Sequence, residues 1–161
     1  MFVDAEKMPD DSRIWIYQSS RAFTSEEVIK ISDLAIDFLN SWTAHNKELK
    51  ASFEIRYHMF LIIMIDSSYT QASGCSIDKS LHFIQKLEKD FIVNLLDRQM
   101  FAIREGDKIN LVRRNDFEKL IEKEISKDSI VFNNLIQTKK ELDSSWEIPI
   151  KDSWHGALLM R

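Results

Sequence analysis

The segment from Ser73 to Asp78 contains the residue types from which a binding site could be built. It follows an apolar stretch that ends at Asp66 and precedes a predicted helix. Free N–H groups at a helix start, together with the helix dipole, favour a bound anion, and Gly74 would let a ligand approach the backbone closely. The same positive end favours the thiolate of a cysteine, so Cys75 could act as a nucleophile or a redox group.

A simpler interpretation explains the same residues without a ligand. Ser76 would be the N-cap of the helix, Gly74 would relieve a turn, and Cys75 would be a small core residue. Under the site hypothesis, the ligand-binding residues are Ser73, Gly74, Cys75 and Ser76. The catalytic candidates are Cys75, Asp78, His45 and His155.

Asp66 and Asp78 could face one cleft, because one ends a predicted buried strand and the other opens the next helix. Paired carboxylates can bind a metal or exchange a proton. Compensation of the helix dipole in the first turn explains Asp78 equally well. We predict no metal site and no cofactor, because metal-ligand spacing is lacking among the four histidines, His45, His58, His82 and His155. His45 is expected to close the first helix.

The first half of the chain predicts one strand, one long helix and a β-hairpin. Arg13–Ser19 contains a short apolar run typical of a buried strand. Thr24 and Glu27 form a capping box at the start of a helix whose apolar residues recur at helical spacing. Lys50–Ile65 is too long for one strand in a chain of this size, so we expect two strands that turn near Tyr57-His58-Met59.

The second half predicts a mixture of helices and strands, followed by an extended tail beyond Pro149. Gly106-Asp107 suits a two-residue hairpin turn, and two further capping boxes mark helix starts. The expected elements are, in order, a helix from Ser76, a hairpin of Met100–Arg104 and Lys108–Val112, a helix capped by Asn115 and Glu118, a strand at Ile130–Phe132, and a short helix capped by Thr138 and Glu141.

This order predicts an α+β fold with a mixed or antiparallel sheet and helices packed on one face. The first six elements, in the first two-thirds of the chain, match a ferredoxin-like (split βαβ) order. The C-terminal tail is expected to be extended. No repeat, low-complexity tract or Pro/Gly-rich linker divides the sequence, so residues 1–161 are predicted to form a single domain.

Composition excludes several classes of protein. The chain is 44% hydrophobic and 30% charged, an ordinary globular balance, and its net charge of −4 gives no field that would attract nucleic acid. The single Cys75 excludes an internal disulfide and fits a reducing compartment. The longest apolar run, Met59–Ile65, is far too short to span a membrane, and the first residues lack the pattern of a signal peptide. We therefore expect a soluble cytoplasmic protein without a membrane partner.

The apolar C-terminal segment Ala157-Leu158-Leu159-Met160 has no accompanying polar pattern. An apolar segment left in water would be a liability. It is therefore expected to dock either onto its own domain or onto a second copy, which would make a homo-oligomer through the tail.

Several stretches together resemble a family of short bacterial proteins that is associated with Bacteroidetes and often labelled "ABC transporter ATPase". The resemblance covers nearly the whole chain and implies no catalytic signature. The stretches are Trp42-Thr43-Ala44-His45, Phe53-Glu54-Ile55-Arg56-Tyr57, Ala72-Ser73-Gly74-Cys75-Ser76-Ile77-Asp78, Val131-Phe132-Asn133-Asn134 and Ser153-Trp154-His155.

The family label does not fit the chemistry of this sequence. ATP hydrolysis by that class needs a phosphate loop of the form G-x-x-x-x-G-K-[ST]. The three glycines, Gly74, Gly106 and Gly156, are too far apart to supply the two that this loop requires. We therefore predict that the chain is not an ATPase.

Two function hypotheses remain, and the sequence leaves open whether the protein is an enzyme. The first is a non-enzymatic binding or protein-interaction module. The alternative is a small enzyme or ligand-binding protein with an anion or thiol site at the Ser73–Asp78 turn. The alternative requires loops to converge on one concave pocket with a perturbed titrating group. The expected neighbours in that pocket are His45, Asn133, Asn134 and His155.

Overall fold

The computed structural model describes residues 1–121, 123 and 125–160, without the side chain of Met160. The chain divides into two compact units. Unit 1 consists of Met1–Leu96 and Gln137–Lys139, and unit 2 consists of Asp97–Ile136 and Lys140–Arg161. The two units differ in which residues pack together, which does not test whether the chain folds as one domain. The single domain over residues 1–161 therefore stays a prediction.

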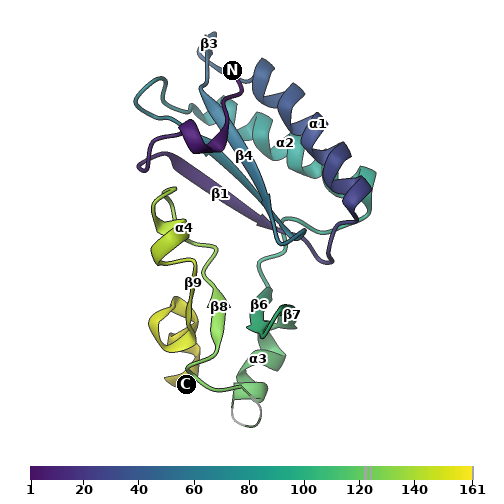
Figure 1. Cartoon of the computed structure of the whole chain (residues 1–161), viewed down its shortest axis with the longest axis vertical. Coiled ribbons are helices and arrows are strands. Elements are labelled where there is room, and N and C mark those ends of the chain that lie inside the picture. The colour runs from purple at the N-terminus through teal and green to yellow at the C-terminus, as the bar shows by residue number, and fades with distance from the viewer. Residues whose placement is uncertain (122, 124, 161) are drawn as a thin grey trace. The chain divides into compact units, whose positions relative to one another are not determined.

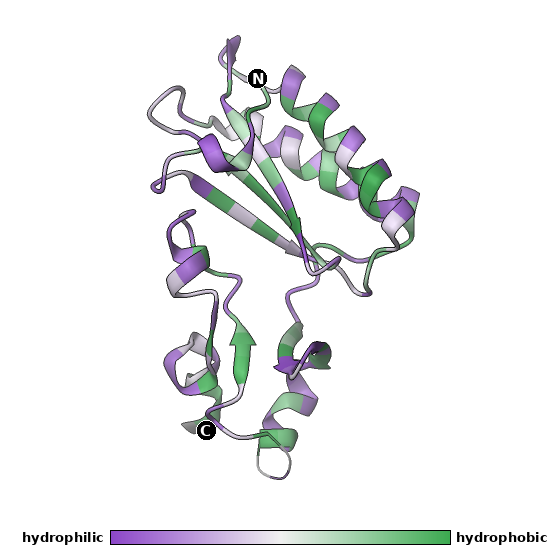
Figure 2. Cartoon of the chain, in the orientation of Figure 1, coloured by the Kyte–Doolittle hydropathy of each residue, from purple (hydrophilic) through white to green (hydrophobic). Residues whose placement is uncertain are grey.

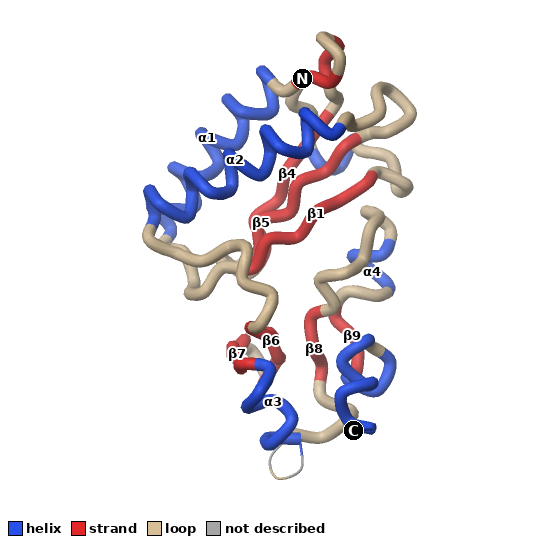
Figure 3. The backbone as a smooth tube through the Cα atoms, turned by 180° about the vertical axis from the view of Figure 1, so that it is seen from behind, coloured by secondary structure: helices blue, strands red, loops and turns tan. Residues whose placement is uncertain are grey.

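Unit 1 is a three-stranded antiparallel sheet with two helices on one face (Figures 1 and 3). The strand order is β1-β5-β4, with β5 in the middle. The elements are β1 Arg13–Gln18, β4 Ala51–Arg56, β5 Phe60–Ile65, α1 Ser25–Ser41 and α2 Gly74–Phe91. The prediction of an α+β fold with helices on one face of an antiparallel sheet is confirmed for this unit.

The first helix begins where its capping box predicts. The hydroxyl of Thr24 accepts a hydrogen bond from the backbone N–H of Glu27, whose carboxylate accepts from the N–H of Thr24. Ile31, Ala35 and Leu39 form the buried stripe of α1. Figure 2 shows apolar and polar residues alternating along α1 and α2, as a helix with one buried face requires.

The central strand β5 is apolar at every position, and all six of its residues are buried. Leu61, Ile63 and Ile65 belong to the core cluster that the two helices cover. The sequence prediction of two strands in Lys50–Ile65 is confirmed, because β4 and β5 pair in register from Arg56↔Phe60 outward.

The ferredoxin-like order is not evident. Its fourth strand, β6 (Met100–Glu105), joins the sheet of unit 2, where β7 (Lys108–Arg113) and β8 (Ile130–Phe132) occupy its two edges. A strand that is paired on both sides has no free hydrogen-bonding edge, so β6 cannot also extend the sheet of unit 1. The order of elements along the chain matches a ferredoxin-like fold only if every strand joins one sheet, and β6 joins a different one.

A short segment from much later in the chain takes the place beside the start of β1. Arg13 forms a bridge with Thr138, the N–H of Ile14 donates to Gln137 O at 2.9 Å, and the N–H of Lys139 donates to Ser12 O at 2.9 Å. Thr138 was expected to cap a helix with Glu141. That prediction is wrong, because the short helix α4 (Glu141–Ser144) begins only at Glu141, with Lys140 as its N-cap residue.

Unit 2 is a four-stranded antiparallel sheet of order β7-β6-β8-β9. Gly106 has a φ of +60° in the turn between β6 and β7, as the predicted hairpin needs. The helix after β7 begins directly at Arg114, so Asn115 lies inside its first turn and does not cap it as expected. The remaining elements are α3 Arg114–Ile121, α4 Glu141–Ser144, β9 Glu147–Pro149 and the 3₁₀ helices η2 Ile150–Asp152 and η3 Trp154–Met160.

The tail is helical and not extended, which corrects the sequence prediction. The N–H of Ile150 donates to Ser129 O at 2.9 Å, and Leu158 is buried in the core of unit 2. Gly156 permits this fold, because a Cβ at that position would lie 2.9 Å from the carbonyl oxygen of Ile150. The apolar tail thus packs within its own unit, so Leu158 offers no surface for a homo-oligomer through the tail.

Among the residues that the structure describes, no helix is both long enough and apolar enough to cross a membrane.

We predict that Leu39→Ala lowers the free energy of unfolding by about 2–5 kcal/mol, because it empties a fully buried position between α1 and the sheet. Urea titration followed by circular dichroism measures the change. Asp37→Ala, at an exposed position of the same helix, serves as the control and should stay within about 0.5 kcal/mol of the parent. Equal losses in the two variants would contradict the assigned helix face.

Candidate functional site

The Ser73–Asp78 turn is a capped helix start. The hydroxyl of Ser73 accepts from the N–H of Ser76 at 3.1 Å, and the hydroxyl of Ser76 accepts from the N–H of Ser73 at 2.8 Å. The helix therefore begins at Gly74, two residues earlier than predicted, and Ser73 is its N-cap in place of Ser76. The sequence did not reveal this capping box because a serine replaces the usual Glu or Gln at its third position.

The residues of the turn differ in their exposure. Ser76 is buried, whereas Gly74, Cys75 and Asp78 are exposed. Cys75 is a free thiol on the surface, which corrects its interpretation as a core residue. Asp78 lies in the second helical turn and not in the first. No hydrogen bond of the described residues uses the N–H groups of Gly74 and Cys75, so these two donors point to solvent.

The turn is fixed to the end of α1 by a buried contact. The indole N–H of Trp42, the C-cap of α1, donates to the carbonyl oxygen of Ser76 at 2.8 Å. Ser76 is therefore held by its carbonyl and its hydroxyl together. This contact accounts for the burial of Ser76 without a ligand.

Asp66 has a structural explanation. Its carboxylate accepts from the hydroxyl of Ser68 at 2.5 Å and from the N–H of Ser68 at 3.0 Å, and it lies 3.3 Å from the ammonium of Lys50. The hydrogen bonds from Ser68, helped by Lys50, hold the pKa of Asp66 below its ordinary value. No described hydrogen bond or ion pair joins Asp66 with Asp78, so the expected carboxylate pair is not formed.

His45 does not close α1 as predicted. It lies in the turn of a small hairpin formed by β2 (Thr43–Ala44) and β3 (Lys47–Glu48). His45 and Asn46 both have positive φ, at 51° and 63°, which is the backbone of a two-residue type I′ turn. The helix ends earlier because Trp42 turns into the core.

His155 is buried in unit 2 among aromatic rings. Its Nδ1 lies 2.7 Å from the hydroxyl of Ser153, and its ring stacks on Trp154 at 3.9 Å and meets the edge of Phe101 at 4.7 Å. Burial lowers the pKa of His155 to about 4. A Ser–His contact can activate a nucleophile, but His155 is only 2% exposed and Ser153 only 8%, so neither is accessible to a substrate.

The two asparagines that were expected near a site also make local contacts. Asn134 Oδ1 accepts from the indole N–H of Trp146 at 2.9 Å, and Asn133 Oδ1 accepts from the N–H of Leu135 at 3.2 Å. Both residues follow β8 and position the chain between β8 and α4. Within the described part of the chain, no group of three His, Cys, Asp or Glu side chains could hold a metal ion.

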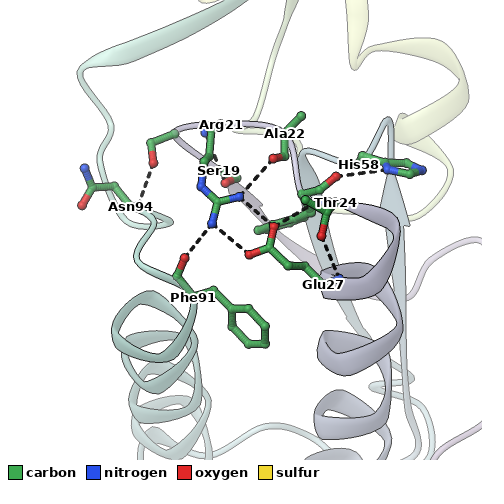
Figure 4. A network of polar contacts seen from close by, with 10 residues as sticks. Ser19, Arg21, Ala22, Thr24, Glu27, His58, Phe91 and Asn94 are labelled. Carbon is green, nitrogen blue, oxygen red and sulfur yellow. Dashed lines mark hydrogen bonds and ion pairs between the residues drawn. The ribbon is translucent and has the colours of Figure 1, made fainter.

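A polar network that sequence reasoning missed lies where the start of α1 meets the end of α2 (Figure 4). The guanidinium of Arg21 donates to both carboxylate oxygens of Glu27, at 2.8 and 2.9 Å, and to the carbonyl oxygen of Phe91 at 2.7 Å. The hydrogen bonds from Arg21, followed by that from Thr24, lower the pKa of Glu27 to about 2. Arg21 thus joins one helix start to another helix end, a contact that no local pattern predicts.

The chain leaves α2 through Ile92, which has a φ of +53° and is 86% exposed. Below it, Glu88 accepts from the backbone N–H groups of Leu95 and Leu96, at 2.8 and 3.3 Å. An open groove of about 450 Å³ lies beside this turn, and we call it the Ile92 groove. It is lined by Ser20, Gln85, Glu88, Lys89, Ile92, Val93 and Asn94.

The Ile92 groove and the Ser73–Asp78 turn lie at opposite ends of α2. The helix has 18 residues, so the two are separated by about 27 Å at 1.5 Å per residue. The predicted site residues of unit 1 therefore do not line this groove. His155, Asn133 and Asn134 belong to unit 2.

No family model, no curated protein and no solved structure matches this chain. The family resemblance inferred from the sequence therefore stays a prediction.

We predict that His155 makes the protein less stable in acid. The pKa of about 4 in the folded state lies below the ordinary 6.5, so the unfolded chain takes up the proton first as the pH falls. The contribution of His155 to the free energy of unfolding is fully present above pH 6.5. It is lost as the pH falls from 6.5 to 4, by about 3 kcal/mol in all. The measurement is the difference in unfolding free energy between the parent and His155→Phe across this range. An imidazole that titrates near pH 6.5 in the folded protein by NMR would contradict it.

Proposed function

We propose that this protein is a protein-interaction module without catalytic activity, and that it binds a partner through the Ile92 groove. The observation that carries the proposal is the exposed, left-handed backbone of Ile92.

A left-handed residue at the end of a helix is usually glycine, because other residues crowd their own backbone there. For a β-branched residue the conformation is a genuine outlier. Ile92 gains no packing energy in return, because its side chain is 86% exposed. Strained residues cluster at binding sites, where the surrounding structure holds them in place. Arg21 and Glu88 provide that support on either side of Ile92.

The character of the groove favours a protein partner over a small molecule. Small-molecule sites are concave and bury most of the ligand, whereas this groove is open. Protein interfaces combine an apolar centre with a polar rim. Ile92 supplies the exposed apolar side chain, since Val93 is buried, and Lys89 and Asn94 supply charge and hydrogen-bonding groups beside it.

The test uses Ile92→Gly, which removes the strain and the side chain together. We expect its free energy of unfolding to rise by about 1 kcal/mol while binding weakens. Proteins captured from a cell lysate by the immobilised parent are identified, purified and titrated calorimetrically with parent and variant. The dissociation constant should rise at least about tenfold for Ile92→Gly, corresponding to about 1.4 kcal/mol. Leu81→Ser, at an exposed position of α2 outside the groove, is the matched control. Equal affinities of parent and Ile92→Gly would refute the proposal.

The alternative function is an anion or thiol site at the Ser73–Asp78 turn, and the exposure of Cys75 beside two solvent-facing N–H groups supports it. This alternative predicts that inorganic phosphate slows the alkylation of Cys75 by iodoacetamide at neutral pH, because a bound anion would occupy the helix start. An alkylation rate that is independent of phosphate in the parent would eliminate this alternative.

A further inference from the structure

The outer edge of β4 has backbone groups that lack a partner. Ala51 points away from β5, because its N–H donates to Met1 O at 3.0 Å and its C=O accepts from Val3 N–H at 2.9 Å. Alternate residues of a strand point the same way, so the N–H and C=O groups of Phe53 and Ile55 also point outward. No hydrogen bond among the described residues uses them.

Beyond Ala51, whose outward groups bond to the N-terminal segment, this edge of β4 has no Pro, Lys or bulge that would prevent pairing. Exposed edges are commonly blunted by Pro, by Lys or by a bulge, and β4 has the sequence ASFEIR with regular pairing to β5. The half-buried Phe53 and Ile55 lie on its helix side. An unprotected edge with apolar side chains is suited to the addition of another strand.

The flank of α1 beside this edge is also apolar. Asn40 Oδ1 accepts from the N–H of Phe2, which lies next to Ala51, at 2.9 Å. That side of α1 therefore faces the β4 edge. Ile36 and Ile29 precede Asn40 by four and eleven residues and so lie on the same side of the helix. Ile29 is 64% exposed, and it lies near the start of α1, at the end of the sheet where Ile55 is found.

We propose that two copies of this chain pair through antiparallel β4 edges, with a two-fold axis at Ile55, so that their sheets join into one. Ile55 of one copy exchanges hydrogen bonds with Ile55 of the second copy. The two Ile29 side chains approach each other beside the axis, where the exposed apolar area that they present is buried.

Charge selects this register. Glu54 and Arg56 lie on the same face of β4, with 2.7 Å between Oε2 and Nε. A two-fold axis at Ile55 places Glu54 opposite Arg56 of the second copy, and Arg56 opposite Glu54 of the second copy. Each side chain keeps its contact within its own strand and gains an opposite charge across the interface. Cross-strand pairs of opposite charge stabilise a sheet.

The neighbouring registers are less favourable. An axis at Glu54 would place two Glu54 carboxylates directly opposite each other, and like charges in that position are destabilising. An axis at Phe53 would pair Ile55 with Ala51 of the second copy, whose outward N–H and C=O are already bonded to Met1 and Val3.

The experiment is a charge-swap series, with the oligomeric state measured by sedimentation equilibrium and the fold checked by circular dichroism. The parent should dimerise. Glu54→Arg and Arg56→Glu should each be folded and predominantly monomeric, because each places like charges opposite each other at both cross-strand positions. An equimolar mixture of the two single variants restores opposite charges at both positions, so it should form a one-to-one dimer. The double variant Glu54→Arg with Arg56→Glu should dimerise like the parent.

Hydrogen exchange of the parent gives a second measurement. The amide of Ile55, which is hydrogen-bonded across the proposed axis, should exchange at least about tenfold more slowly in the dimer than in the single variants. A parent that stays monomeric at about 100 µM, single variants that dimerise as the parent does, or a mixture that stays monomeric would each overturn the proposal. Binding of an unrelated extended peptide at this edge by a monomeric parent would overturn it as well.

Discussion

The architecture of unit 1 follows from one constraint, the burial of β5. Six consecutive apolar side chains alternate between the two faces of a strand, so neither face can be left in water. Its backbone is satisfied along both edges as well, because β1 and β4 pair with it on its two sides. The helices follow from the same constraint, because Leu61, Ile63 and Ile65 need an apolar cover that the stripes of α1 and α2 supply.

Local chemistry explains which parts of the fold could be predicted from the sequence. The start of α1 and the β4–β5 and β6–β7 hairpins depend on residues close together in the chain, and each is found where it was expected. The pairing of β6 depends on residues 130–132, and the edge of β1 depends on residues 137–139. Such distant partners have no signature in the sequence near either strand. The helical tail was missed for a similar reason, since its geometry depends on the close approach of Gly156 to Ile150.

The candidate site was only partly predictable. The Ser73–Asp78 turn is a helix start, as the residue types indicated, but Cys75 is exposed and not in the core, and the serines hydrogen-bond to each other. The only sequence feature that indicated the Ile92 groove was the lack of a glycine after the apolar residues of α2. Arg21 is separated from Phe91 by 70 residues, so the support beneath Ile92 is a product of tertiary structure. The helix end and the edge of β4 are both places where regular structure stops or is incomplete, and surfaces available to partners concentrate there.

The bridge between Arg13 and Thr138 has a consequence for synthesis of the chain. Unit 1 is discontinuous, because its sheet edge is completed by residues 137–139. A ribosome that has made only the first 96 residues has produced both helices and all three strands, yet Ile14 and Ser12 still lack their partners on that edge. All of unit 2 up to Ile136 has to be translated before this edge can close. The nascent chain therefore carries an incomplete sheet for the time needed to add some forty residues, a few seconds at about 5–20 residues per second, and its strand edge is open to wrong partners during that time.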